Sequence, residues 1–181
     1  MNIVILGPQG SGKGTQAKLL ATKFKFFYFE SGEFLRGLAK KNETVRKFLD
    51  SGQLVPSEEF ASYVCAYLDE KEIYDNILFD GFPRELNQYF FFKKWLTDRD
   101  MKFDLAILLE VSKEVTIERL MKRKREDDTG QAIQERLEIY RNETLPLISE
   151  LEKGTQLVRV DGERTIEEIQ KDLIEIVAKK L

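Results

Sequence analysis

A glycine-rich stretch near the start of the chain has the residue types that bind phosphate groups. Residues 7–16 read Gly-Pro-Gln-Gly-Ser-Gly-Lys-Gly-Thr-Gln; they follow the apolar run 3–6 and precede a segment with a helical pattern. Glycines allow several backbone N–H groups to converge on an anion, and a helix N-terminus adds about half a positive charge. Lys13 adds a full charge that can reach the β- and γ-phosphates of a nucleotide. The stretch therefore predicts a phosphate-binding loop between a buried strand and a helix.

The residue after Lys13 departs from the general pattern of such loops. The pattern places Ser or Thr there, whereas this chain has Gly14 and carries the hydroxyl one position later, at Thr15. A second motif, Asp-Gly-Phe-Pro-Arg, begins at Asp80, directly after the apolar run 77–79. An acid at the end of a neighbouring strand is where phosphate-loop proteins hold Mg2+. Asp80 is therefore the expected metal residue, and we expect it to act through water.

Arginines supply the remaining positive charge. In the second motif Gly81 permits close approach of the backbone and Pro83 fixes the turn, so we expect Arg84 to project toward the ligand. The alternative is a strand-ending turn with a solvated arginine. Arg119 and Arg123 stand four residues apart on an expected helix, where like charges repel by about 0.2–0.5 kcal/mol. That pair fits a shared anionic ligand, and it also fits a solvated basic helix end.

Apolar runs alternating with helical patterns are expected to position these residues. The expected strands are 3–6, 26–29, 77–80, 105–109 and 157–160. The expected helices lie around 13–23, 33–40, 43–51, from 57 onward, 85–98, 113–122, 131–151 with an interruption near Pro146, and 166–177. Ser31 is expected to cap the second helix. This order predicts an α/β fold with a five-stranded parallel sheet covered by helices on both faces. The glycine loop, Ser31, Asp80 and Asp161 then meet at the carboxyl edge.

Composition narrows the possible functions. The chain has 181 residues, enough for one domain, and 29 basic against 32 acidic residues give a net charge of −3. That balance argues against a broad nucleic-acid or anionic-membrane surface. Histidine is absent, which excludes histidine triads and histidine zinc sites. The single cysteine, Cys65, is expected in the core of a protein from a reducing compartment. With no signal peptide or long apolar segment visible, we expect a cytoplasmic protein.

Several motifs together resemble the adenylate kinase family. In addition to the glycine loop they are Ser-Gly-Glu-Phe-Leu-Arg at 31–36, Gly-Gln-Leu-Val-Pro at 52–56, and the motif at 80–84 followed by Gln88. The similarity continues, in order, through Arg119, Arg123, residues 125–128, Arg136 and residues 160–162. The glycine loop alone indicates only a nucleotide binder. The combination implies a P-loop kinase fold and the conversion of ATP and AMP into two molecules of ADP, with Mg2+.

The resemblance implies two sets of binding residues. For ATP they would be Gly10, Ser11, Gly12, Lys13, Gly14, Thr15, Arg119, Arg123 and the backbone near Arg164. For AMP they would be Ser31, Arg36, Gln53, Leu54, Val55, Gly81, Phe82, Pro83, Arg84, Gln88, Arg125 and Arg136. Catalysis would fall to Lys13, Arg84, Arg123, Arg125 and Arg136. These cations suit phosphoryl transfer, which needs positioning and charge stabilisation more than acid–base chemistry.

The resemblance leaves the choice of monophosphate open. An amide such as Gln88 can bind adenine bidentately, whereas uridylate/cytidylate kinases tend to have asparagine at this position. Gln88 therefore favours AMP, while Ser31 in place of the commoner threonine weakens that preference slightly. The alternatives are a uridylate/cytidylate kinase or a broad-specificity monophosphate kinase. A nucleotide-dependent assembly factor or switch with weak turnover is an alternative of another class.

The family pattern also implies how the chain is divided. Residues 1–30, 56–122 and 129–181 would form the core, and residues 31–55 a helical monophosphate-binding insertion. The lid over ATP would be unusually short, at 123–128, because only Lys124 separates Arg123 from Arg125. We therefore expect closure to involve mainly the insertion. A monomer is expected, and an oligomer whose neighbouring subunit shields the site is the alternative.

Overall fold

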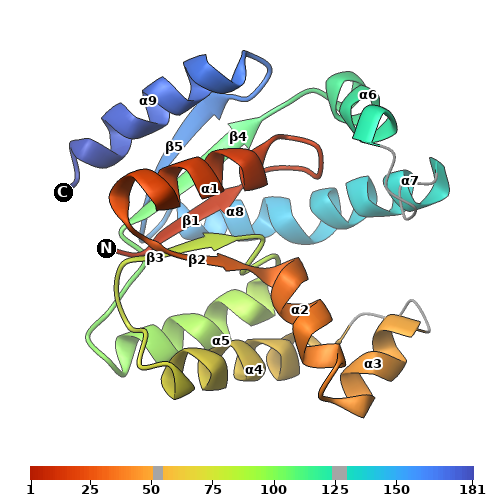
Figure 1. Cartoon of the computed structure of the whole chain (residues 1–181), viewed down its shortest axis with the longest axis vertical. Helices are drawn as coiled ribbons and strands as arrows, with labels where there is room; N and C mark the ends of the chain where they lie inside the picture. The colour runs from red at the N-terminus through yellow and green to blue at the C-terminus, as the bar shows by residue number, and fades with distance from the viewer. Residues whose placement is uncertain (51–54, 124–129) are drawn as a thin grey trace.

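A computed structural model describes residues 1–50, 55–123 and 130–181, with the side chains of 49, 50, 123, 131 and 132 outside the description. Its described residues form one parallel sheet in the order β2-β3-β1-β4-β5 (Figure 1). The strands are β1 (Ile3–Leu6), β2 (Phe27–Glu30), β3 (Ile77–Asp80), β4 (Leu105–Glu110) and β5 (Gln156–Asp161). The predicted five-stranded parallel sheet is confirmed, with shifts of a residue or so at the strand ends.

Helices cover both faces of this sheet. They are α1 (Lys13–Phe24), α2 (Ser31–Ala39), α3 (Glu43–Asp50), α4 (Ser57–Glu70), α5 (Leu86–Thr97), α6 (Lys113–Arg123), α7 (Gly130–Ile139), α8 (Leu145–Leu151) and α9 (Ile166–Ala178). Side chains alternate along a strand, so Ile3 and Ile5 of β1 pack toward α1 and α9, whereas Val4 packs toward α4, α5 and α8 (Figure 1). The central strands are buried on both faces, which explains their continuous apolar runs.

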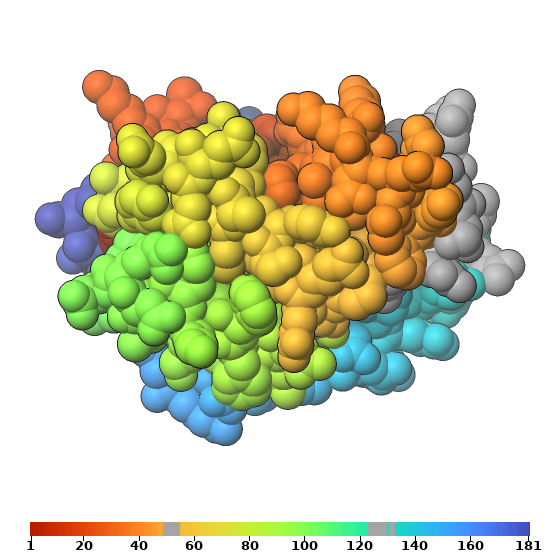
Figure 2. All heavy atoms as spheres, turned by 90° about the horizontal axis from the view of Figure 1, so that it is seen from below, coloured from red at the N-terminus to blue at the C-terminus, as the bar shows by residue number. Residues whose placement is uncertain are grey.

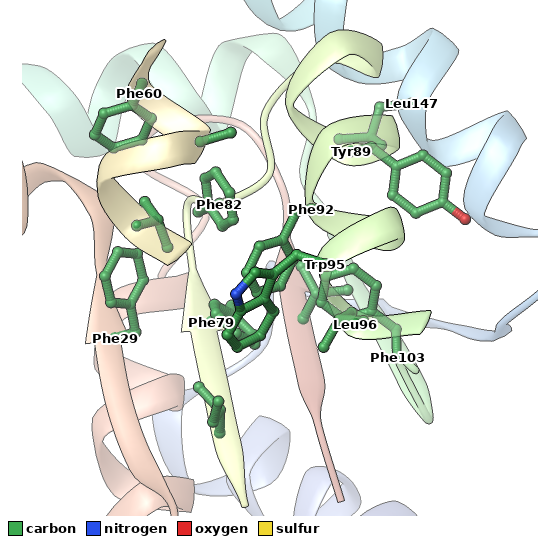
Figure 3. Packing of buried hydrophobic residues seen from close by; sticks show 14 of the residues in the cluster. Phe29, Phe60, Phe79, Phe82, Tyr89, Phe92, Trp95, Leu96, Phe103 and Leu147 are labelled. Carbon is green, nitrogen blue, oxygen red and sulfur yellow. The ribbon is translucent and has the colours of Figure 1, made fainter. Parts of the chain in front are cut away.

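Aromatic side chains fill the layer between the sheet and helices α4 and α5 (Figure 3). Phe82 meets Phe92 edge-on with ring centroids 5.0 Å apart, and Phe92 stacks on Trp95 at 5.1 Å. Of the aromatic residues of α5, Tyr89, Phe92 and Trp95 are buried in this layer, but Phe90 and Phe91 are 49% and 38% exposed. A helix turns about 100° per residue, so consecutive aromatics cannot all face the same core.

Helices α2 and α3 pack on each other beside β2, and on the surface they lie next to α4 (Figure 2). The predicted capping role of Ser31 is wrong. Helix α2 begins at Ser31 itself, with Glu30 at the N-cap position and no side-chain cap. The Ser31 hydroxyl instead accepts a hydrogen bond from the Arg84 guanidinium, so a contact distant in sequence replaces the local one.

The predicted long helix near the C-terminal end is interrupted, as expected. A π-helical segment, Tyr140–Thr144, separates α7 from α8, and Pro146 lies in the first turn of α8. Proline lacks the N–H that would bond to the preceding turn, and its ring crowds the carbonyl there, which favours a wider turn before it. Among the helices of the described ranges, none combines the length and apolar character needed to cross a membrane.

Candidate active site at the carboxyl edge of the sheet

The loop between β1 and α1 is shaped by its glycines. Gly12 precedes α1 with a φ of 89°, a left-handed conformation, and a Cβ added there would meet no heavy atom within 4 Å. A Cβ on Gly7 would instead lie 2.7 Å from the Ser11 hydroxyl and 2.8 Å from the Leu109 carbonyl oxygen. The loop is therefore tightly packed at its start and open at the N-terminus of α1, where unpaired helical N–H groups can bind an anion.

Lys13 is the first residue of α1, and Gly14 and Thr15 follow it in the first turn. The Lys13 ammonium group donates a hydrogen bond to the Pro8 carbonyl oxygen at 3.2 Å, so its side chain folds back over the loop. Ser11 is fully buried, and its hydroxyl has no hydrogen-bond partner among the described residues. Gly10 packs on α6, because a Cβ there would lie 3.0 Å from the Thr116 carbonyl oxygen.

Asp80 ends β3 beside this loop and is only 6% exposed. Burial raises the pKa of its carboxyl group, while the nearby Lys13 charge and a hydrogen bond from Tyr28 lower it. The Tyr28 hydroxyl donates to Asp80 Oδ2 at 2.9 Å. A carboxylate is a hard oxygen ligand, and Mg2+ typically uses one or two carboxylates together with water and substrate phosphates. The chemistry of Asp80 and its place beside the phosphate loop therefore fit Mg2+.

Arg84 is held close to Ser31 by the turn after β3. Its guanidinium donates through Nη2 to the Ser31 hydroxyl at 3.0 Å and through Nε to the Gly81 carbonyl oxygen at 2.8 Å. Gly81 has a φ of 74°, and a Cβ there would lie 2.8 Å from the Ser31 hydroxyl. The pKa of Arg84 lies below its ordinary value, because the surrounding protein disfavours the charged form and Arg136 repels it. The negative charge of Asp80 acts in the opposite direction and raises the pKa. An arginine remains charged throughout such shifts, so Arg84 places one cation near Asp80, and Arg136 places a second cation near Arg84.

The other residues expected at the monophosphate lie around this centre. Arg36 is 3.7 Å from a Glu30 carboxylate oxygen, and its side chain is 64% exposed. Gln88 is buried; its amide oxygen accepts from the Arg84 N–H at 2.9 Å, and its amide nitrogen donates to Glu85 at 3.1 Å. Both ends of the Gln88 amide are therefore engaged in this structure. Phe82, Pro83 and Val55 are buried, whereas Gln53 and Leu54 lie outside the described residues.

At the other side of the phosphate loop, Arg119 binds the turn after β5. Its guanidinium donates to the Gly162 carbonyl oxygen at 2.7 Å and to the Glu163 carbonyl oxygen at 3.3 Å. Arg164 pairs with Asp172 at 2.7 Å. Arg119 thus connects α6 to the segment expected to border adenine. The Arg123 side chain and Arg125 lie outside the described part of the chain.

Sequence reasoning missed Tyr28 and Glu30. The parallel register places Glu30 opposite Asp80 and Tyr28 opposite Leu78, so both side chains face the same side of the sheet as the Asp80 carboxylate. Side chains alternate between the two faces along a strand, so the sequence could have predicted that Tyr28 and Glu30 share one face of β2. The pairing of β2 with β3, however, is a tertiary fact that no local pattern contains.

The fold and this site define a class of protein. A parallel sheet in this order, with a glycine-rich loop between β1 and α1 and an acid at the end of the adjacent β3, is typical of P-loop nucleotide-binding proteins. A family model described as adenylate kinase matches residues 5–156. The chain belongs to the adenylate kinase family.

Full-length relatives agree with this assignment. An adenylate kinase of Corynebacterium aurimucosum is 37% identical to this chain, over 99% of this chain and 100% of its own length. An adenylate kinase of Corynebacterium urealyticum is 36% identical, over 93% of this chain and 94% of its own length. An adenylate kinase of Clostridium perfringens is 32% identical over 98% of each chain.

Proposed function

We propose that this chain catalyses the reversible, Mg2+-dependent transfer of the γ-phosphoryl group of ATP to AMP, giving two molecules of ADP. The observation that carries the proposal is the gathering of Lys13 and Arg84 about Asp80 at the carboxyl edge of the sheet, with Arg136 close to Arg84. Phosphoryl transfer spreads negative charge over the equatorial oxygens, and fixed cations stabilise that charge. Family membership supports the same activity.

In this proposal the loop backbone from Gly10 to Thr15 and the Lys13 ammonium group hold the ATP phosphates. The Lys13 contact with Pro8 is exchanged for a phosphate oxygen when ATP binds. Asp80 would hold Mg2+ in this proposal, as expected through water, and the ion would supply positive charge to the β- and γ-phosphates. Arg119 flanks the base while it anchors the turn at Gly162, a contact that keeps this side of the site in place before ATP arrives.

Ser31, Arg36, Arg84 and Gln88 hold AMP in this proposal. The Arg84 fork, already fixed by Ser31 and Gly81, binds the AMP phosphate, and Arg36 leaves its weak pair with Glu30 to join it. The Gln88 amide turns away from Glu85 to bind adenine. Arg136, together with Arg123 and Arg125, stabilises the phosphoryl group in transfer.

The division of the chain is part of the proposal: a core of 1–30, 56–122 and 129–181, a monophosphate-binding insertion of 31–55, and a minimal lid of 123–128. The alignment with the Clostridium perfringens enzyme spans 212 positions, more than the 181 residues of this chain, so that relative has residues without a counterpart here. We infer a cytoplasmic monomer; the free, buried Cys65 suits a reducing compartment.

A substrate panel tests the activity. ADP formation from MgATP is measured with AMP, CMP, UMP and GMP in parallel. We expect kcat/KM to be highest for AMP, because an amide matches the donor and acceptor on adenine. Equal or greater rates with CMP or UMP would favour a uridylate/cytidylate kinase. Tight ATP binding with no transfer to any monophosphate would favour a nucleotide-dependent switch.

A further inference from the structure

Tyr28 contacts the expected metal residue from the edge strand β2. Its hydroxyl lies 2.9 Å from Asp80 Oδ2 and 3.3 Å from a Glu30 carboxylate oxygen. A phenol has one proton to donate, and the shorter distance favours Asp80 as the acceptor. The ordinary pKa of a tyrosine hydroxyl is about 10. The hydroxyl therefore stays protonated and remains a donor at working pH.

The Tyr28 ring is held in place by its surroundings. It packs against the apolar cluster under α1, and the Lys18 ammonium group of that helix lies 5.5 Å from the ring centroid. Lys18 also lies 3.5 Å from Glu30 Oε2, which draws the second carboxylate toward α1. The Tyr28 side chain therefore has little conformational freedom, and its hydroxyl can hold Asp80 Oδ2 in one position.

The same Asp80 oxygen lies against Gly14. A Cβ added at Gly14 would be 3.1 Å from Asp80 Oδ2, closer than ordinary van der Waals contact. In the general phosphate-loop pattern this position carries the Ser or Thr hydroxyl. Here the position carries no side chain, the carboxylate approaches the first turn of α1, and the hydroxyl that contacts it comes from Tyr28.

We propose that Tyr28 is a positioning residue for Mg2+–nucleotide binding: its hydrogen bond fixes Asp80 Oδ2 beside Gly14 and so orients the carboxylate that would hold Mg2+. The proposal rests on the proposed function in one respect, since it assumes that ATP binds at the phosphate loop with Mg2+. In this proposal Tyr28 acts through Asp80 and not by contact with the ion or the nucleotide.

The test compares ATP affinity of the wild type and Tyr28→Phe by titration calorimetry, once with excess Mg2+ and once with EDTA. A hydrogen bond to a charged group is worth about tenfold in an equilibrium constant. We therefore expect Tyr28→Phe to bind ATP about tenfold more weakly with Mg2+ and unchanged in EDTA. Tyr63→Phe is the matched control, because it also loses a hydroxyl that donates to a carboxylate, Glu59 at 2.6 Å, outside the site.

Two outcomes would overturn the proposal. Equal weakening with Mg2+ and with EDTA would mean that Tyr28 only supports the fold, and an unchanged affinity with Mg2+ would mean that Asp80 needs no help. Asp80→Asn and the double variant complete a cycle: if Tyr28 acts through Asp80, Tyr28→Phe adds no further loss in the Asp80→Asn background. Failure of the wild type to bind ATP at all would count against the proposed function instead.

Discussion

Arg84 connects two elements of the expected AMP site through its own hydrogen bonds. Its guanidinium holds Ser31 at the start of α2 and the Gly81 carbonyl oxygen at the end of β3. The fork is therefore held in place by protein groups, which limits the conformational freedom that it would lose on binding a phosphate. A lysine could not replace it, because an ammonium group lacks the two-pronged geometry.

Removing Arg84 should abolish most of the activity. We expect Arg84→Ala to lower kcat about a thousandfold, the scale found for arginines that stabilise a transferring phosphoryl group. Stopped-flow or coupled assays of ADP formation measure it. Arg99→Ala is the control: Arg99 lies between α5 and β4 and pairs with Asp69 of α4, so its removal should leave kcat unchanged. Near-normal turnover of Arg84→Ala would refute the role assigned to this residue.

Cys65 should be chemically inert in the folded protein. Burial in α4 raises the pKa of its thiol from 9.0 to about 12, and the thiolate is the reactive form. At pH 8 the thiolate fraction falls by roughly a thousandfold relative to an exposed cysteine. We expect Ellman's reagent to react with native protein far more slowly than with urea-unfolded protein, and faster as pH rises. Rapid native labelling at pH 8 would contradict the buried placement.

At the scale of one element, α5 presents adjacent aromatics to different environments. Phe92 is fully buried among Phe79, Phe82, Trp95 and Phe103, whereas Phe91 is 38% exposed (Figure 3). The two residues have the same side chain in the same helix. They differ only in what surrounds them.

This contrast predicts very different costs for the same substitution. Phe92→Ala should lower the free energy of unfolding by about 3–5 kcal/mol, because it removes buried apolar surface and leaves a cavity. Phe91→Ala should change it by less than about 1 kcal/mol. Urea unfolding followed by circular dichroism measures both. Similar losses for the two variants would mean that α5 is rotated from the orientation described.

At the scale of the molecule, the sheet and its covering helices form one packed body, while α2 and α3 stand beside it (Figure 1). Helix α2 contacts β2 and α3, and its Phe34 packs on Phe60 and Tyr67 of α4, with ring centroids 6.0 and 5.0 Å apart. A helix pair at the edge of a sheet can swing over a bound nucleotide and exclude water, as closing segments do in many enzymes. We therefore expect closure to come from this side.

Distances between spin labels would test whether closure comes from α2 and α3 or from the segment 123–128. One pair joins Lys47 of α3 to Lys171 of α9, each replaced by cysteine in a Cys65→Ser background; a second joins Lys124, outside the described residues, to Lys171. A bisubstrate inhibitor combining ATP and AMP should shorten the first distance and leave the second nearly unchanged. A larger change at Lys124 would show that the short segment 123–128 is the moving part.

Much of this protein follows from local patterns in its sequence. The glycine spacing with Lys13 predicts the phosphate loop, because φ angles and the helix N-terminus are properties of a few neighbouring residues. The apolar runs predict the strands and the parallel sheet, since a strand covered on both faces must be apolar throughout. The motif at 80–84 predicts an acid and an arginine at the carboxyl edge.

Tertiary structure alone decided which side chains meet. Ser31 contacts Arg84 instead of capping its helix, Gln88 turns its amide to Arg84 and Glu85, and Arg119 binds the turn after β5. Tyr28 reaches Asp80 because β2 pairs in register with β3, across 52 positions of sequence. Strand pairing and helix orientation are set by the packing of the whole core. A one-residue change in the register of β2 would turn the Tyr28 side chain to the other face of the sheet, away from Asp80. For that reason residue types could be assigned from the sequence, and partners could not.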